Sequence, residues 1–197
     1  MSNIYENFWK TIDSKSSLTQ LQRYENKKSP EYIKKFISLG GGPKMGYTCE
    51  KFAKFYFKSL QNRKKGTNET GYDHIVNINN SSFYIEQKSS GHWEDNDYRW
   101  QHIEEKHKWN ILLLCGIDFN DVKFWVMNRD IFEKLIKLNK IKNQGNKSGE
   151  SSEGRWFNYL EVKDHLIEIK SDDDLINYIK STNKLTLNLE DEYIIYE

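Results

Sequence analysis

The spacing of hydrophobic and polar positions changes from helical to strand-like near residue 70. Apolar residues recur at helical spacing in residues 47–62, whereas apolar and polar residues alternate in "YDHIVNIN" and "SFYIEQKSS". The turn-forming residues Asn79, Asn80 and Ser81 separate these two alternating segments. We therefore predict a helix followed by a β-hairpin. Upstream, residues 3–39 read as short helices, and "LGGGPKMG" reads as a loop.

The rest of the chain predicts further strands and helices. Helical spacing marks "DYRWQHIEEKHKW", a buried-strand run marks "NILLLCGID", and alternation marks a strand in "VKFWVM". Further segments are a helix over residues 129–142, a loop in "NQGNKSGESSEG", strands in "RWFNYLEV" and "HLIEI", and a helix in "DDDLINYIK". This order predicts an α/β fold in which helices flank a mixed β-sheet.

The length and the net charge of the chain limit its possible architecture and partners. The 197 residues carry a net charge of +1, so no global field attracts the chain to a polyanion, and any nucleic-acid surface must be local. We expect a single domain with an N-terminal helical part (1–45), a core (46–128) and a C-terminal part (129–197). No signal peptide and no apolar run of about 20 residues is found, which predicts a cytoplasmic protein without membrane contact.

Charged residues in the predicted hairpin suggest a site. Alternation sends Glu86 and Lys88 to the same face of their strand, and antiparallel pairing brings Asp73 toward the same end. Glu50 lies at the edge of the apolar face of the preceding helix. Charges that approach a core are costly unless they are paired or coordinated. The alternative is an accidental Glu/Lys surface pair with an unrelated Asp73.

These residue types suit attack on a phosphodiester. Mg²⁺ prefers hard oxygen ligands and is commonly held by one or two carboxylates together with water and phosphate. Such a metal lowers the pKa of a bound water and neutralises charge on the phosphate. A lysine such as Lys88 can orient that water or stabilise the developing charge.

The segments "GYDHIV" and "FYIEQKSS" resemble the core of the PD-(D/E)XK nucleases, the restriction-endonuclease-like superfamily. In this resemblance Asp73 matches the first acid, Glu86 the second and Lys88 the lysine. The helix "GYTCEKFAKFYF" resembles the one that places an additional glutamate, here Glu50, toward the metals. The sequence departs from the pattern at Tyr72, where a proline commonly stands.

The resemblance implies a restriction-endonuclease-like core with recognition loops. Asp73, Glu86 and Glu50 would hold Mg²⁺, for which Mn²⁺ would substitute, and Gln101 would assist from the following helix. The implied activity is that of a type II restriction endonuclease cutting double-stranded DNA, as a monomer or a homodimer, with a cognate DNA methyltransferase in the host. The alternatives are a repair or recombination nuclease like a Holliday junction resolvase, and a non-catalytic DNA-binding relative.

DNA contacts are expected from basic residues and from a polar segment beside the motif. Lysines and arginines neutralise phosphates, although a solvated surface is the ordinary explanation for any single lysine. In the predicted loop "SSGHWEDNDYRW", Asn96 and Arg99 are placed to reach base edges. The residues predicted to bind DNA are Arg63, Lys64, Lys65, His92, Trp93, Asn96, Arg99 and Lys147. The C-terminal part would add sequence recognition.

Overall fold

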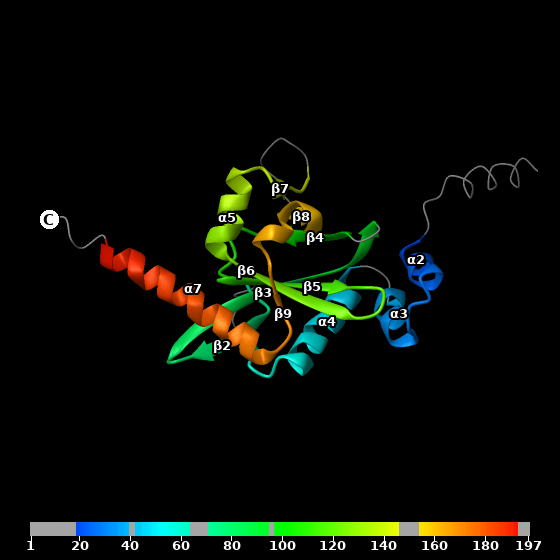
Figure 1. Ribbon diagram of the computed structural model, residues 1–197, viewed down its shortest axis with the longest axis horizontal. Coiled ribbons are helices and arrows are strands. Elements are labelled where there is room, and N and C mark those ends of the chain that lie inside the picture. The colour runs from blue at the N-terminus through cyan, green and yellow to red at the C-terminus, as the bar shows by residue number, and fades with distance from the viewer. Residues whose placement is uncertain (1–18, 40–41, 64–70, 95–96, 146–153, 193–197) are drawn as a thin grey trace, which may run out of the picture.

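A mixed β-sheet forms the centre of the structure (Figure 1). The computed structural model describes residues 19–39, 42–63, 71–94, 97–145 and 154–192. Within these residues the sheet has nine strands. They are β1 (Gln61–Asn62), β2 (His74–Ile78), β3 (Ser81–Glu94), β4 (Asp97–Ile103), β5 (Ile111–Ile117), β6 (Val122–Asn128), β7 (Lys142–Asn143), β8 (Arg155–Asn158) and β9 (Ile167–Ile169).

Strand β3 organises the sheet because three strands pair with it. The order is β7-β8-β4-β3-β5-β6-β9, and β1 and β2 add to the β3 side. Strand β5 runs parallel to β3 along Ile85–Gly91. On the opposite edge, β2 pairs only as far as Ile85 and β4 begins only at His92. Among the described strands, none pairs with residues 86–91 on that edge, so the sheet has a gap there.

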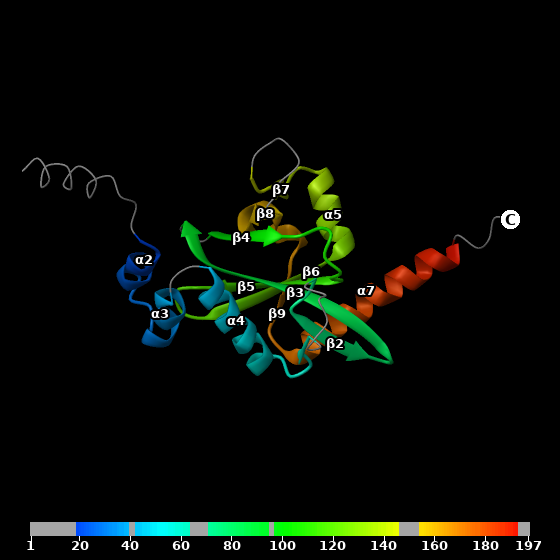
Figure 2. The ribbon, with the colours of Figure 1, turned by 180° about the vertical axis from the view of Figure 1, so that it is seen from behind.

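Helices cover both faces of the sheet (Figures 1 and 2). Side chains of α2, α3, α4 and the start of α7 pack on one face, and those of α5 and α6 pack on the other. The fold is therefore of the α/β class, as predicted. The bounds are α2 (Gln20–Asn26), α3 (Glu31–Ser38), α4 (Pro43–Tyr56), α5 (Arg129–Lys137), α6 (Tyr159–Val162), a 3-10 helix (Lys163–His165) and α7 (Asp172–Glu192). Of the described helices, none is long and apolar enough to cross a membrane.

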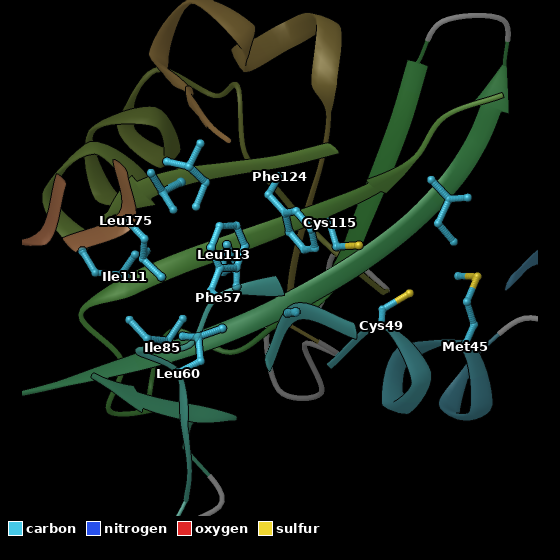
Figure 3. Packing of buried hydrophobic residues seen from close by; sticks show 14 of the residues in the cluster. Met45, Cys49, Phe57, Leu60, Ile85, Ile111, Leu113, Cys115, Phe124 and Leu175 are labelled. Carbon is cyan, nitrogen blue, oxygen red and sulfur yellow. The ribbon is translucent and has the colours of Figure 1, made fainter. Parts of the chain in front are cut away.

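The packing of α4 against β3 and β5 fixes the position of Glu50. Cys49 of α4 faces Cys115 of β5, and Phe57, just after the helix, packs beside Leu113 (Figure 3). Full burial of a side chain as large as that of Phe57 or Leu113 contributes about 1.5–3 kcal/mol. Because α4 is held in this way, Glu50 is carried to the gap in the sheet.

The predicted hairpin is confirmed. Strands β2 and β3 pair antiparallel from His74↔Ile85 to Ile78↔Ser81. The two turn residues, Asn79 and Asn80, have φ angles of 48° and 64°. Asparagine tolerates this left-handed conformation, which the favoured two-residue hairpin turn requires at both positions. The predicted strands at β5 and β6 and the helices at α5 and α7 also form.

The segment predicted as a helix after the motif is instead strand β4. Tyr98 and Trp100 point into the core, and the intervening Arg99 points away from it. Trp100 is fully buried against Phe157 of β8, and its indole N–H donates to the carbonyl of Cys115 at 3.1 Å. Pairing with β3 and β8 thus overrides the helical spacing. Because β3 itself runs to Glu94, the predicted polar loop from Ser89 is mostly strand.

Two other boundaries differ from the predictions. Helix α4 begins at Pro43, because proline suits the first helical position, so the predicted loop is shorter. The same helix ends at Tyr56, since Ser59 turns the chain by donating its N–H and hydroxyl to Asp172. The predicted strand "RWFNYLEV" divides into β8 and α6.

Candidate active site

Asp73 lies in the gap of the sheet, directly before β2. Its backbone N–H donates to the carbonyl of Ile85 at 2.8 Å, which extends the hairpin by one bond. Its carboxylate Oδ2 accepts the backbone N–H of Gln87 at 2.8 Å. Gln87 separates Glu86 from Lys88 in the chain. The structure therefore brings Asp73 beside the two charged residues with which the sequence analysis grouped it.

Glu86 and Lys88 form a largely buried ion pair. Lys88 Nζ lies 2.7 Å from Glu86 Oε1, and the two side chains are 22% and 6% exposed. Their contact agrees with the alternation along β3, which places them on the same face. Among the described residues no further hydrogen bond reaches Glu86 Oε2 or Asp73 Oδ1. Within this part of the chain, one oxygen of each carboxylate therefore has no hydrogen-bond partner.

Burial and a neighbouring carboxylate raise the pKa values of two glutamates in the site. Burial raises the pKa of Glu86 to about 7, and the carboxylate of Asp73 adds to the effect, while Lys88 opposes it. Burial also raises the pKa of Glu50, again with Asp73 adding to the effect and with Arg63 opposing it. Asp73 therefore lies close enough to both glutamates to repel them. A bound cation would relieve this repulsion.

The described side chains include no group of three or more His, Cys, Asp or Glu residues arranged to hold a metal ion. Magnesium does not require such a group, because one or two carboxylates with water and a substrate phosphate commonly suffice. Asp73 and Glu86 supply two hard oxygen ligands next to a hydrogen-bonding backbone, and Glu50 adds a third carboxylate nearby. The residues present therefore fit a Mg²⁺ ion completed by the substrate.

A cavity of about 660 Å³ opens at this point between the start of α4 and strand β4. Glu50, Asp73 and Lys88 line it from one side, and Gln101 and His102 line it from the other. Its size leaves room for a phosphate group with part of a nucleotide. The structure thus joins Glu50 and Asp73 to an accessible space, whereas the buried Glu86 lies behind Lys88 and is not among the lining residues.

Gln101 reaches the cavity from a strand and not from a helix as predicted. The pairing of β4 with β8 shifts register between Trp100 and Ile103, and His102 has a φ angle of 57°. Such a bulge re-aims neighbouring side chains. Gln144 supports it by accepting the N–H of His102 at 2.8 Å. Sequence reasoning missed Gln144 and the bulge, because the bulge depends on pairing with distant β8.

His74 and Gln87 form a second contact that the sequence analysis missed. His74 is fully buried, and its Nε2 lies 2.8 Å from Gln87 Oε1. Burial lowers the pKa of His74, so the neutral ring donates from Nε2 to this oxygen. The bond connects the residue after Asp73 to the residue between Glu86 and Lys88. It therefore holds the two motif segments in register.

Some residues predicted to bind DNA lie at the site. Arg63 is exposed, and its charge lowers the pKa of Glu50. Arg99 lines the cavity, and Trp93 is 49% exposed beside it, with the Arg99 guanidinium 4.4 Å from the ring centroid. The other residues predicted to bind DNA, apart from His92, are outside the described part of the chain, namely Lys64, Lys65, Asn96 and Lys147.

The prediction of a DNA contact at His92 is wrong. The His92 side chain is 3% exposed, and its ring stacks between those of Tyr98 and Phe119. Its Nε2 lies 2.9 Å from Asp118 Oδ1. The cause of the error is the length of β3, which turns a presumed loop residue into a packed strand residue.

No protein-family model, no curated protein and no solved structure matches the chain. The restriction-endonuclease-like core therefore stays a prediction from the residues. The arrangement of Asp73, Glu86 and Lys88 must be interpreted through its own geometry and charge.

Proposed function

We propose that this protein is a Mg²⁺-dependent endonuclease that hydrolyses phosphodiester bonds of double-stranded DNA. The observation that carries the proposal is the hydrogen bond from the Gln87 N–H to the Asp73 carboxylate. It places Asp73 next to the Glu86 and Lys88 ion pair, at a gap of the sheet that opens into a cavity. Two acids beside an ammonium that lines the cavity are suited to phosphodiester hydrolysis with a bound metal ion.

The carboxylates of Asp73 and Glu86 would hold the metal, with Glu50 contributing directly or through water. Bound Mg²⁺ lowers the pKa of a water and neutralises negative charge on the phosphate. The Gln87 N–H keeps the Asp73 carboxylate oriented, and burial restricts the Glu86 side chain. This preorganisation means that little rearrangement is needed when substrate binds.

Lys88 has the most direct part in the proposed chemistry. Its ammonium is fixed by Glu86 at 2.7 Å and lines the cavity. In that position it can orient the attacking water by hydrogen bonding and stabilise the charge that builds on the phosphate oxygens. A fixed cation is worth more for the transition state than for the substrate, because the charge increases as the bond forms.

Sequence-specific cutting, as by a type II restriction enzyme, is the form of this activity that we favour. Arg99 and Gln101 line the side of the cavity opposite Asp73, and both side chains can donate to base edges or phosphates. Strands β7 and β8 of the C-terminal part lie next to β4 in the sheet. Recognition would therefore come from the β4 side of the cavity.

The test is incubation of the purified protein with plasmid DNA and Mg²⁺. Discrete fragments would support a restriction enzyme, and cutting of branched DNA alone would support a structure-specific nuclease. Asp73→Asn should abolish cutting in either case. Asp121→Asn is the matched control, because Asp121 is an exposed aspartate whose carboxylate lies 4.0 Å from Lys123, outside the site. Undiminished cutting by Asp73→Asn, or cutting in excess EDTA, would contradict the proposal.

A further inference from the structure

The outer face of the sheet at β4, β8 and β7 carries an aromatic and cationic surface. Core residues alternate with outward-facing ones on these strands, so that Trp100 and Phe157 point inward, while Arg99 and Trp156 point to the opposite face. Trp93, at the end of β3, adds a second ring. We refer to Trp93, Arg99, Trp156 and Lys142 as the Trp–Arg surface.

Cations and rings alternate in this surface. The Arg99 guanidinium carbon lies 4.4 Å from the centroid of the Trp93 ring and 4.9 Å from that of Trp156. Lys142 Nζ lies 5.2 Å from the Trp156 ring. All these distances are within the range of cation–π attraction. One ammonium and one guanidinium are thereby held against two indole rings.

Neighbouring hydrogen bonds make the surface rigid. The indole N–H of Trp156 donates to the carbonyl of Asn143 at 3.0 Å, and Arg99 Nε donates to Asn158 Oδ1 at 2.9 Å. The carbonyl of Trp93 accepts a hydrogen bond from Arg23 of α2. Groups that are already ordered lose little entropy when a ligand binds.

Burial does not explain this arrangement. The Trp93 side chain is 49% exposed, whereas Trp100 on the inner face is fully buried. Among the described side chains, Arg99 has an amide partner in Asn158 but no carboxylate partner. Arg99 also lines the cavity that contains Asp73 and Lys88. The exposed ring and the charge therefore lie beside the proposed cutting site.

We propose that the Trp–Arg surface binds an unpaired nucleobase of a DNA strand next to the phosphate that is cut. The inference rests on the proposed function, to which it adds the state of the substrate. An unpaired base offers its flat face to the exposed indole of Trp93, and stacking of this kind tolerates any base. The positive charge of Arg99 complements a flanking phosphate, whereas Lys142 is paired with Glu161 at 2.9 Å and serves to hold the Trp156 ring. Bases inside an intact duplex cannot stack in this way, because both of their faces are covered.

Binding measured in EDTA tests the inference without any cleavage. The probes are a fluorescent oligothymidylate and a blunt, fully paired duplex of equal length. Trp93→Ala should weaken oligothymidylate binding by about 5- to 150-fold, which corresponds to about 1–3 kcal/mol for one stacked base. Binding of the duplex should change by less than twofold. Trp93→Phe should restore most of the lost affinity, because it restores a ring.

Phe55→Ala is the matched control. Phe55 is 73% exposed and carries Lys58 at 4.6 Å from its ring, but it does not line the cavity. This variant should bind both probes as the wild type does. Trp156→Ala provides a second test of the surface. If this variant does not fold, the Trp93 variants alone test the inference, because Trp93 is half exposed and its replacement leaves the core intact.

The inference would be overturned if Trp93→Ala bound oligothymidylate within twofold of the wild type, or lost equal affinity for both probes. Tighter binding of oligouridylate than of oligothymidylate would assign the surface to RNA and overturn the assignment to DNA. Failure of the proposed function is a separate result. A wild-type protein that binds oligothymidylate through Trp93 but never cuts DNA with Mg²⁺ would refute the nuclease and support the base-binding surface.

Discussion

Two clusters of charged side chains lie along strand β3, one around His92 and one around Lys88. The pKa of the carboxylate is lowered in the first cluster, and the pKa values of the glutamates are raised in the second. Around His92, the Asp118 carboxylate accepts hydrogen bonds from His92 Nε2 at 2.9 Å, from the Phe119 N–H at 2.7 Å and from Lys123. These donors, His92 above all, hold the pKa of Asp118 well below its usual range. One carboxylate is thus surrounded by donors.

Around Lys88 the balance is reversed. The pKa values of Glu86 and Glu50 are raised, because Glu86 is buried, Glu50 is half-buried, and both lie near the Asp73 carboxylate. In the cluster at Asp118, hydrogen bonds and the Lys123 ion pair stabilise the carboxylate, so this cluster can contribute to the stability of the fold without a bound ligand. The cluster at Lys88 holds carboxylates in an unfavourable ionised state, which is typical of sites that bind a cation or transfer protons.

The largest difference between the clusters should appear in activity. Lys88→Ala should reduce DNA cleavage by about a thousandfold or more, because its ammonium acts on the transition state. DNA binding measured with Ca²⁺ should remain largely intact. Lys123→Ala removes the corresponding lysine from the other cluster and should leave the cleavage rate unchanged. Paired cleavage and gel-shift assays on both variants provide the measurement.

Two outcomes would break this contrast. Full cleavage by Lys88→Ala would refute the nuclease. Loss of DNA binding by a folded Lys88→Ala would make the residue a phosphate contact only.

The second difference concerns stability. Asp118→Asn should destabilise the protein by about 2 kcal/mol, since it removes a charged acceptor and leaves the buried His92 with a weaker partner. Urea denaturation at pH 7 measures the change. An Asp118→Asn protein as stable as the wild type would show that the cluster is not a structural one.

The pH dependence of this loss has a definite sign. The pKa of Asp118 is depressed on folding from an ordinary value of 3.8, so its ionised form stabilises the fold. The advantage of the wild type over Asp118→Asn should be constant from pH 7 to pH 5. It should shrink below about pH 4, where the unfolded chain takes up the proton first.

Glu86 should behave in the opposite way. Its pKa rises on folding from 4.5 to about 7, so ionised Glu86 destabilises the fold and the cost grows as pH rises through this window. Glu86→Gln should therefore stabilise the protein by about 2 kcal/mol at pH 8, with loss of the Lys88 ion pair reducing the gain. At pH 4 the two proteins should be equally stable. Thermal unfolding at both pH values tests this expectation.

Magnesium should remove the cost at Glu86. A cation that binds only the folded protein stabilises it by mass action. Mg²⁺ should raise the melting temperature of the wild type at pH 8, and it should raise that of Glu86→Gln much less. Equal shifts in the two proteins would place the metal elsewhere.

How far the sequence predicted the molecule depended on whether a feature is local. The hairpin of β2 and β3 was predictable because its turn residues and its alternation lie within twenty residues. The grouping of Asp73 with Glu86 and Lys88 followed from that hairpin. Glu50 was also placed toward the site, since its helix packs one apolar face on the sheet.

The features that failed depend on distant partners. Helical spacing in "DYRWQHIEEKHKW" suggested a helix, and only the pairing of β4 with β8 makes it a strand. The same pairing creates the bulge at His102 and assembles Arg99 with Trp156. His92 was expected at the surface, because the residues near it in the chain do not indicate that it is buried beside Asp118, which lies 26 residues away in the sequence.

The smallest expected effect concerns Glu50. Burial and Asp73 raise its pKa, but it is only half-buried, and Arg63 and Lys54 partly offset the increase. Glu50→Gln should therefore stabilise the protein at pH 8 in the same direction as Glu86→Gln, by less, and with no gain at pH 4. Replacing Asp73 by Asn as well should give a smaller total gain than the sum of the two single changes, because the repulsion between the two carboxylates is counted once. Urea denaturation of the single and double variants at both pH values measures this coupling. Additive effects would show that Glu50 and Asp73 do not interact, and Glu50 would then leave the proposed metal site.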